Sequence, residues 1–189
     1  MRNIIYFLLC SLFLVSCSAN RYLNYINTKI DKDIKANLNV DSISVFDHRT
    51  NISDSDIKLP FISHPKQLIK TIPPIDSTHI ETIKNTIKQS CSGNEDRIKI
   101  NVNIIEAYKE FSATFASEKE KVYVEIQLDM VDSHGNLSVL CSSHAEYDLA
   151  ISDAKHKNFE ELYLLAFKGA IITCLQKVKN EPSTPYINE

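Results

Sequence analysis

Hydrophobic and polar residues alternate along three stretches in the second half of the chain, at residues 98–104, 122–130 and 139–149. A period of two residues is typical of a β-strand that buries one face. The polar segment 132–136 contains a glycine and separates the second stretch from the third, so we expect a hairpin there. Residues 109–121 are largely polar, and we expect them to form a loop between the first two strands.

Two further stretches place apolar residues at helical spacing. In the first, Thr78 and Glu81 match a capping box and precede isoleucines that share one helix face. We expect this helix to end near Cys91, because Ser-Gly-Asn follows it. The second helix is expected to begin with Asn158 as its N-cap and Glu161 three residues later. Its predicted buried stripe contains Phe159, Leu162, Tyr163, Ala166, Ala170, Cys174 and Val178.

The first half of the chain carries weaker patterns. Residues 40–46 have the β-branched composition of a strand, and residues 22–30 are expected to hold one early strand. Strand, helix, three-strand meander and helix together predict an α+β two-layer sandwich, an antiparallel-rich sheet with two helices on one face. The other sheet face is expected to be solvated, and it would carry Lys99, Asn101, Glu125, Gln127, Glu146 and Asp148.

The amino-terminal segment has the organisation of a lipoprotein signal. A short positive n-region precedes an apolar run over residues 4–15, which is too short to span a bilayer and suits a signal-peptide h-region. The run ends in Leu14-Val15-Ser16-Cys17, which resembles the bacterial lipobox. In that motif the cysteine thiol takes a diacylglyceryl group, and the small residue before it admits the signal peptidase. Resemblance further implies that the new amino terminus is acylated.

The chain is therefore expected to have four parts: a signal peptide (1–16), a lipidated Cys17 with a tether (17–39), an α+β domain (40–180) and a disordered tail (181–189). An ordinary secretory leader, cleaved near Ser16 or Ala19, is the alternative. Two or more acyl chains would hold the protein on a membrane effectively permanently. Ser18 follows the lipidated cysteine, where an Asp would imply inner-membrane retention. We therefore expect the periplasmic face of the outer membrane.

The composition argues against several kinds of binding and catalytic site. The formal net charge of −3 lacks the positive excess that nucleic-acid binding requires, so we expect no nucleic-acid partner. The six histidines show no metal-ligand spacing, and the three glycines are too few for a phosphate-binding loop. No nucleophile–base pair is apparent, so we expect neither a catalytic site nor a metal or cofactor. An outward row of His144, Glu146 and Asp148 could form a metal or acid–base cluster, but a solvated sheet face is favoured.

The mature chain contains Cys91, Cys141 and Cys174 besides Cys17. The oxidising periplasm permits a disulfide, and three thiols allow three pairings. We favour Cys91–Cys174, because neighbouring helices would bring their backbones close enough. Three reduced, buried thiols remain the alternative.

Asp47-His48-Arg49 follows the strand at residues 40–46, and strand ends often carry binding residues, so this triplet is a candidate interaction site. A local Asp–Arg ion pair is the favoured alternative. The lipobox, this strand with its Asp-x-Arg, the capped helix and the meander with its terminal helix resemble the YajG-like lipoproteins. The resemblance covers about residues 20–178, and that family comprises outer-membrane lipoproteins without an established activity.

Three functions follow from these patterns. The leading hypothesis is a non-enzymatic envelope lipoprotein that presents its α+β domain to a protein partner. The second is an auxiliary lipid-binding subunit of an envelope transport system, with an apolar groove beneath residues 61–75. An enzyme of the cell wall or envelope is the third.

Overall fold

The computed structural model describes residues 22–25, 34–53, 57, 68–94, 97–114, 117–133, 135–150 and 154–180. The predicted signal peptide, Cys17 and the tail at 181–189 lie outside these residues. The elements in chain order are β1 (Tyr22–Tyr25), β2 (Asn39–Asp47), β3 (Leu68–Thr71), α2 (Ser77–Ser90), β4 (Arg97–Ala113), β5 (Ser117–Val131), β6 (Asn136–Ala150) and α3 (His156–Asn180).

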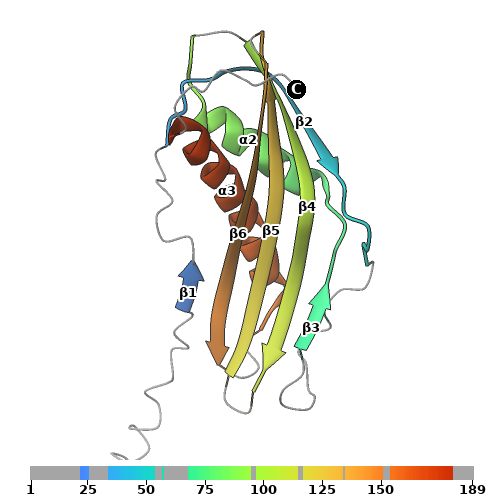
Figure 1. The fold of residues 1–189 in the computed structure, drawn as a ribbon. Helices are drawn as coiled ribbons and strands as arrows, with labels where there is room; N and C mark the ends of the chain where they lie inside the picture. Colours follow the sequence, from blue (N-terminus) through green and yellow to red (C-terminus); the bar gives the residue numbers. More distant parts are fainter. Residues whose placement is uncertain are drawn as a thin grey trace, which may run out of the picture.

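One mixed, mostly antiparallel sheet forms the first layer, with its strands in the order β1-β6-β5-β4-β2. β2 runs parallel to the first half of β4, and β3 runs antiparallel to the second half of the same strand. Both helices lie on one face of the sheet, where α3 crosses β5 and β6 and α2 lies against α3 (Figure 1). The predicted α+β fold, a sheet with helices packed on one face, is confirmed.

The core lies between this sheet and the helices, and it follows the predicted periodicities. Alternate residues of β5 and the predicted stripe of α3 are buried there, except that Val178 is only partly buried. Fully buried side chains of this type contribute about 1.5–3 kcal/mol each. The largest of them include Phe111, Phe159, Phe167, Tyr163 and Ile126.

The predicted loop at residues 109–121 is wrong, because β4 continues to Ala113 and β5 begins at Ser117. The cause is a β-bulge, since the β4–β5 register shifts between Ile104 and Glu106. An extra residue reverses which side chains face the helices. Lys109 and Phe111 consequently point into the core, where an unbroken alternation would have placed their neighbours.

The N-terminal ends of both helices differ from the prediction. Asp76, not Thr78, caps α2, and its carboxylate accepts a hydrogen bond from the His79 amide at 3.0 Å. α2 ends at Ser90, with Cys91 as C-cap as expected. α3 begins at His156, so Asn158 lies inside the helix and is buried.

The domain also begins earlier than residue 40. Ile34 and Ala36 are buried in the core, and the Ala36 amide donates to the Ser90 carbonyl at 2.8 Å. Gly93 permits this segment to pass close by, because a Cβ there would lie 2.7 Å from the Leu38 nitrogen. β1 covers the first four residues of the strand predicted for residues 22–30 and pairs with β6, and residues 26–30 lie outside the described residues. The predicted hairpin is confirmed, and its Gly135 has a positive φ of 153°.

Candidate functional site

The Asp-x-Arg of β2 forms the centre of a buried polar cluster. The Arg49 side chain is 3% exposed, and its Nη2 lies 2.6 Å from Asp47 Oδ2. Its Nε donates to Asp47 Oδ1 at 2.7 Å, which completes a bidentate pair. Bidentate pairs of this kind fix geometry as well as charge. The pair therefore locks the turn that ends β2.

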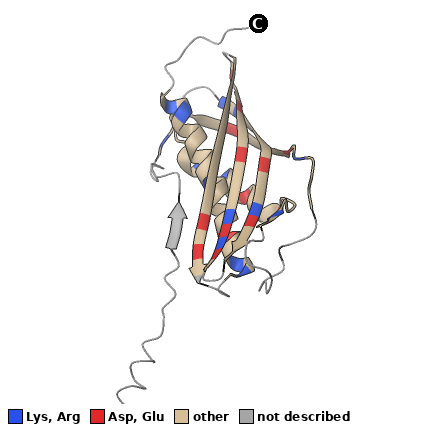
Figure 2. Cartoon of the chain, turned by 60° about the horizontal axis from the view of Figure 1, so that its bottom comes forward, with Lys and Arg blue, Asp and Glu red and all other residues tan. Residues whose placement is uncertain are grey.

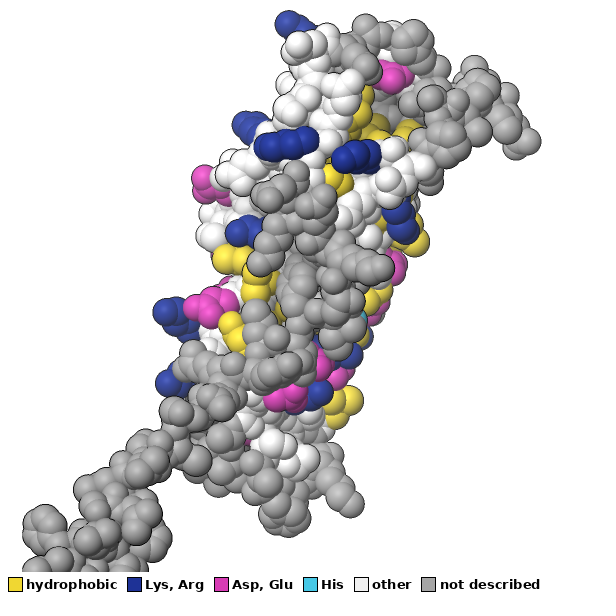
Figure 3. Space-filling view, turned by 90° about the vertical axis from the view of Figure 1, so that its left-hand side faces the viewer, with side chains coloured by type: hydrophobic (Ala, Val, Ile, Leu, Met, Phe, Trp, Pro, Cys, Tyr) yellow, Lys and Arg dark blue, Asp and Glu magenta, His cyan; other side chains and the backbone are white. Residues whose placement is uncertain are grey.

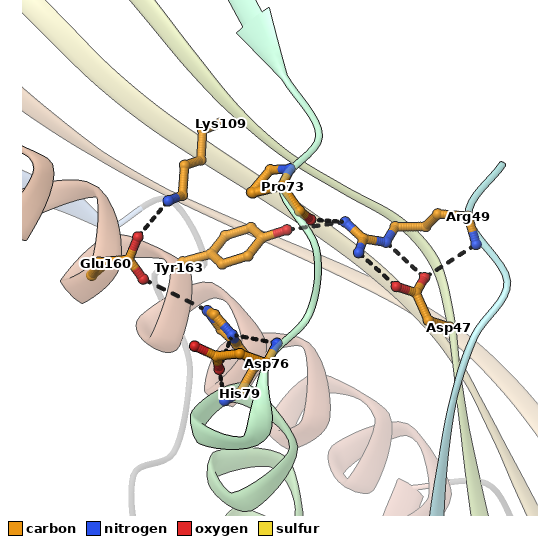
Figure 4. A network of polar contacts seen from close by, with 8 residues as sticks. All are labelled: Asp47, Arg49, Pro73, Asp76, His79, Lys109, Glu160 and Tyr163. Atoms are coloured by element: carbon orange, nitrogen blue, oxygen red, sulfur yellow. Dashed lines mark hydrogen bonds and ion pairs between the residues drawn. The ribbon is translucent and has the colours of Figure 1, made fainter. Parts of the chain in front are cut away.

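The remaining donors of Arg49 reach across the domain. Its Nη1 donates to the Pro73 carbonyl at 3.0 Å, to the Ala107 carbonyl at 3.0 Å and to the Tyr163 hydroxyl at 3.2 Å. Pro73 lies in the segment before α2 and Tyr163 in α3 (Figure 4), and Ala107 belongs to β4. A single guanidinium thus joins the sheet to the segments that carry both helices.

A second set of contacts extends the cluster to the helix N-termini. His79 lies edge-on to the Tyr163 ring, with ring centroids 5.0 Å apart, and its Nδ1 is 2.6 Å from Asp76 Oδ1. Lys109, which the bulge turns inward, forms an ion pair with Glu160 of α3 (Figure 4). Polar side chains from α2, α3 and β4 therefore meet around one tyrosine.

The charges in the cluster stabilise one another. Burial by itself favours the protonated acid, but the hydrogen bonds and charge of Arg49 lower the pKa of the Asp47 carboxyl below its ordinary value. Burial likewise opposes the Arg49 charge, yet Asp47 and Tyr163 raise the pKa of Arg49. Burial raises the pKa of Tyr163. The cluster is consequently an ionised Asp–Arg pair beside a neutral tyrosine.

This geometry separates the three residues of the candidate interaction site. Arg49 is enclosed and pairs with Asp47, which is the local ion pair of the alternative, while a role of the triplet in binding a partner stays a prediction. His48 lies toward the opposite, helix-free face, where its Nε2 lies 3.0 Å from Asn103 Oδ1. The triplet is therefore a structural lock plus one surface histidine. The sequence could not distinguish these roles, because burial depends on the packing of β4 and α3.

Two buried carboxylates lie in the segment predicted as a loop, so their burial could not be predicted from alternation. Glu118 and Glu120 are buried on the inner face of β5. Glu118 accepts a hydrogen bond from the Ala154 amide at 3.0 Å, and Glu120 accepts one from the Lys155 amide at 2.7 Å. Acidic groups are favoured at a helix N-terminus. Because α3 has no acidic residue in its own first turn, β5 supplies these carboxylates to its N-terminus.

The predicted Cys91–Cys174 disulfide is wrong. Cys141 and Cys174 form the bond instead, with their Cα atoms 5.5 Å apart. The inner face of β6 points at α3, so a strand cysteine meets the helix cysteine. Cys91 lies instead at the end of α2, beside Ala36, and is a free thiol. Burial raises the pKa of the Cys91 thiol to about 11, which makes it a poor nucleophile.

The helix-free face of the sheet carries an ordered aromatic row. Tyr108 and Tyr123 are cross-strand partners, and their rings stack with centroids 5.3 Å apart. Lys70 of β3 lies 3.6 Å from the centroid of the Tyr108 ring. His144 is the cross-strand partner of Tyr123 on β6. We call these four residues the tyrosine row.

Charged residues of both signs surround the tyrosine row, as Figure 2 shows along the strands of the sheet. Glu106 and Glu125 are cross-strand partners on one side, and Lys121 and Glu146 are partners on the other. Lys119 lies 3.2 Å from Glu146 Oε1 and 3.4 Å from Asp148 Oδ1. Two members of the candidate row, Glu146 and Asp148, are thus paired with Lys119, while His144 lies beside Tyr123.

Within the described ranges, no group of three or more His, Cys, Asp or Glu residues could hold a metal ion. None of the helices in that part of the chain has the length and apolar character needed to cross a bilayer. Residues 61–67, half of the segment expected to cover a lipid groove, lie outside the described residues, and residues 68–71 form β3.

No protein-family model matches the chain, and no curated protein matches it either. The likeness to YajG-like lipoproteins therefore stays a prediction.

Proposed function

We propose that the chain is a non-enzymatic lipoprotein of the bacterial envelope, anchored by lipidated Cys17 at the periplasmic face of the outer membrane. In this proposal the α+β domain binds a protein partner through the helix-free face of its sheet. The tyrosine row is the observation that carries the proposal. It places aromatic side chains in fixed positions on the layer that the helices leave open.

Aromatic residues are enriched at protein interfaces because they bury a large area with few rotatable bonds. Tyr108 contacts both the Lys70 ammonium and the Tyr123 ring, and these contacts restrict its rotamer before binding. Binding a side chain that is already ordered saves about 0.5–1.5 kcal/mol of conformational entropy. The face therefore offers a preorganised contact surface.

The charges beside the row indicate what the partner should carry. Glu106 and Glu125 are directly opposite one another on neighbouring strands, and like charges in that position are unfavourable. Lys70 lies 3.1 Å from Glu106, and the Tyr123 hydroxyl donates to Glu125 at 2.8 Å, which relieves part of the repulsion. A Lys or Arg of the partner would complete the neutralisation.

The test is affinity capture of the full-length chain from crosslinked envelopes, with mass spectrometry of the captured proteins. Lys70→Ala and Lys157→Ala form a matched pair, because both remove an exposed lysine but only Lys70 belongs to the tyrosine row. We expect Lys70→Ala and Tyr108→Ala to lose a specific partner that wild type and Lys157→Ala retain. Cys17→Ala should release the protein from the membrane fraction.

Retention of the same partner by Tyr108→Ala and Lys70→Ala would contradict docking through the helix-free face. A wild-type chain that fractionates like Cys17→Ala would contradict the lipid anchor. Hydrolytic activity in the purified protein would contradict the non-enzymatic role.

A further inference from the structure

A single row of cross-strand partners marks the lower end of the sheet in Figure 1. It crosses β3, β4, β5, β6 and β1 at one level, and it consists of Leu68, Ser112, Lys119, Asp148 and Tyr22. β4 and β6 end just beyond this row, and β5 begins just before it. We call these residues the end row.

The end row lies close in sequence to the proposed lipid anchor. Only four residues separate Cys17 from Tyr22. Because an extended chain spans at most about 3.6 Å per residue, Tyr22 lies within roughly 18 Å of Cys17. Gly135, in the hairpin at the other end of the sheet, lies roughly 44 Å from Asp148 along β6, at about 3.4 Å per residue. A lipid on Cys17 therefore holds the end row next to the bilayer, whatever the position of the hairpin.

The tether is too short to admit a folded protein beneath the end row. A small domain is about 30 Å across, which exceeds the roughly 18 Å that the chain between Cys17 and Tyr22 can span. The surface that faces this end of the domain is consequently the headgroup layer of the membrane itself.

α3 begins at the level of the end row, on the other face of the sheet. The Lys155 amide donates to Glu120, which is next to Lys119 on β5. Lys155 and Lys157 are exposed, and the Lys157 side chain is 84% accessible. Basic residues are unfavourable at a helix N-terminus, so the stability of α3 does not account for these two lysines. An anionic surface outside the chain would account for them.

The acidic side chains near the end row pair with neighbouring lysines. Glu146 and Asp148 lie 3.2 and 3.4 Å from the Lys119 ammonium, and Glu160 pairs with Lys109. Figure 3 views the side of the molecule that carries β1, and it shows acidic and basic side chains beside one another in the lower half. These pairs reduce the repulsion between this end of the domain and an anionic surface.

Two lysines and a leucine are available for contact at this end. Among the described residues, no ion pair engages the Lys155 ammonium. Lys157 lies 3.8 Å from Glu161 on the helix surface, and exposed pairs of this kind contribute little. Leu68 is 63% exposed and lies on the helix-free face, because Lys70, two positions later, contacts the tyrosine row there. Cations bind phospholipid headgroups, and exposed leucines enter the interfacial layer beneath them.

We propose that this end of the domain binds the phospholipid headgroups of the membrane that holds Cys17. Lys155 and Lys157 contact the anionic phosphates, and Leu68 enters the interfacial layer. The inference rests on the proposed lipid anchor and orients the domain on it. The tyrosine row lies only about 14 Å from the end row, from His144 to Asp148 along β6, so the protein partner docks close to the membrane.

The test uses the full-length, lipidated chain in vesicles of phosphatidylethanolamine and phosphatidylglycerol, with a photoreactive phenylalanine analogue at Leu68 or at Leu140. These positions are a matched pair, because both leucines lie on the helix-free face and are 63% and 51% exposed. Leu140 lies roughly 27 Å from the end row along β6. Mass spectrometry of the crosslinked peptides should find phospholipid adducts at Leu68 and not at Leu140.

Two double variants of α3 test the lysines. Lys155→Gln with Lys157→Gln removes both cations at the start of the helix, whereas Lys177→Gln with Lys179→Gln removes two exposed cations from its last turn. Each lysine near an anionic surface strengthens binding about fivefold. Phospholipid adducts at Leu68 should therefore fall about fivefold or more in the first variant and in vesicles of phosphatidylcholine alone, and stay unchanged in the second. The first variant removes positive charge from a helix N-terminus, so it should remain folded.

Equal phospholipid adducts at Leu68 and Leu140, or none at either, would overturn the proposal. Adducts at Leu68 that do not decrease in Lys155→Gln with Lys157→Gln would overturn the contact between these lysines and the headgroups. A wild-type chain that leaves the vesicles as readily as Cys17→Ala would instead contradict the lipid anchor of the proposed function. Partner capture through the tyrosine row is measured separately, because neither lysine belongs to that row.

Discussion

Replacing Arg49 by methionine removes a charge from the centre of the buried cluster while keeping an unbranched side chain of similar length. Asp47, whose side chain is only 26% exposed, would keep its charge without a cation. The Tyr163 hydroxyl and the Pro73 and Ala107 carbonyls would each lose a donor. Removing one partner of a buried pair costs about 3–5 kcal/mol.

The measurement is urea unfolding of the purified domain with its disulfide intact, compared with two reference substitutions. Tyr163→Phe removes one hydrogen bond of the same cluster and should cost about 1 kcal/mol. Lys70→Met breaks an exposed ion pair with Glu106 and should cost less than about 1 kcal/mol. If Arg49→Met lowers the free energy of unfolding no more than Lys70→Met does, the cluster does not hold the sheet and the helices together.

The same pair predicts a pH dependence. Because the pKa of Asp47 is lowered in the folded state, its contribution is fully present above its unfolded pKa, which is about 3.9. The contribution is lost as the pH falls through the lower folded pKa. The unfolding free energy of wild type should therefore fall more steeply below pH ~4 than that of Arg49→Met. Equal acid dependence in the two proteins would show that Asp47 gains nothing from Arg49.

Three further predictions concern other parts of the domain. Replacing Cys141 and Cys174 by alanine should lower the unfolding free energy by about 3–4 kcal/mol, from the loop entropy of a 33-residue separation. When the unfolded wild-type chain is treated with an alkylating reagent in the absence of reductant, mass spectrometry should find Cys91 alkylated. A peptide crosslinked through Cys91 and Cys174 would contradict the Cys141–Cys174 disulfide. Glu120→Gln should cost about 1.5–3 kcal/mol in urea unfolding, because it weakens a charge-assisted bond to the N-terminus of α3. Gly93→Ala should cost about 1–3 kcal/mol in the same assay, because its Cβ would meet backbone that cannot move aside, and an unchanged midpoint would refute that.

The control for Glu120→Gln lies on the helix-free face of the sheet. Glu110→Gln changes the same chemical group as Glu120→Gln, at a partly exposed position, and should leave the unfolding midpoint nearly unchanged. An equal effect at both positions would mean that overall charge, rather than the contact with α3, causes the loss.

Most of the fold followed from periodicity. Alternation predicted the inner faces of β5 and β6, and helical spacing predicted the stripe of α3, because a side chain's direction depends only on local backbone geometry. The hairpin was also predictable from local sequence, because a glycine such as Gly135 is favoured where the turn requires a positive φ. The helix N-termini were predicted less accurately. Asp76 rather than Thr78 is the N-cap of α2, and the N-terminus of α3 receives its carboxylates from β5.

The polar cluster could be predicted only in part. The sequence indicated an Asp47–Arg49 pair, since the two residues are near neighbours at a strand end. It could not indicate that Tyr163, more than a hundred positions away, would contact Arg49. A single extra residue at the bulge decided that Lys109 would face the core, and alternation by itself gives no sign of where a strand will shift.

The sequence by itself thus indicated most of the elements, the inner faces of β5, β6 and α3, and the lipobox that predicts a membrane anchor, because these depend on residues close together in the chain. Only the tertiary structure decided the order of the strands in the sheet, which cysteines met and which charges were buried. Those outcomes depend on distant segments arriving at one place, where burial turns an ordinary Asp–Arg turn into the contact that joins the sheet to α3 and to the segment before α2.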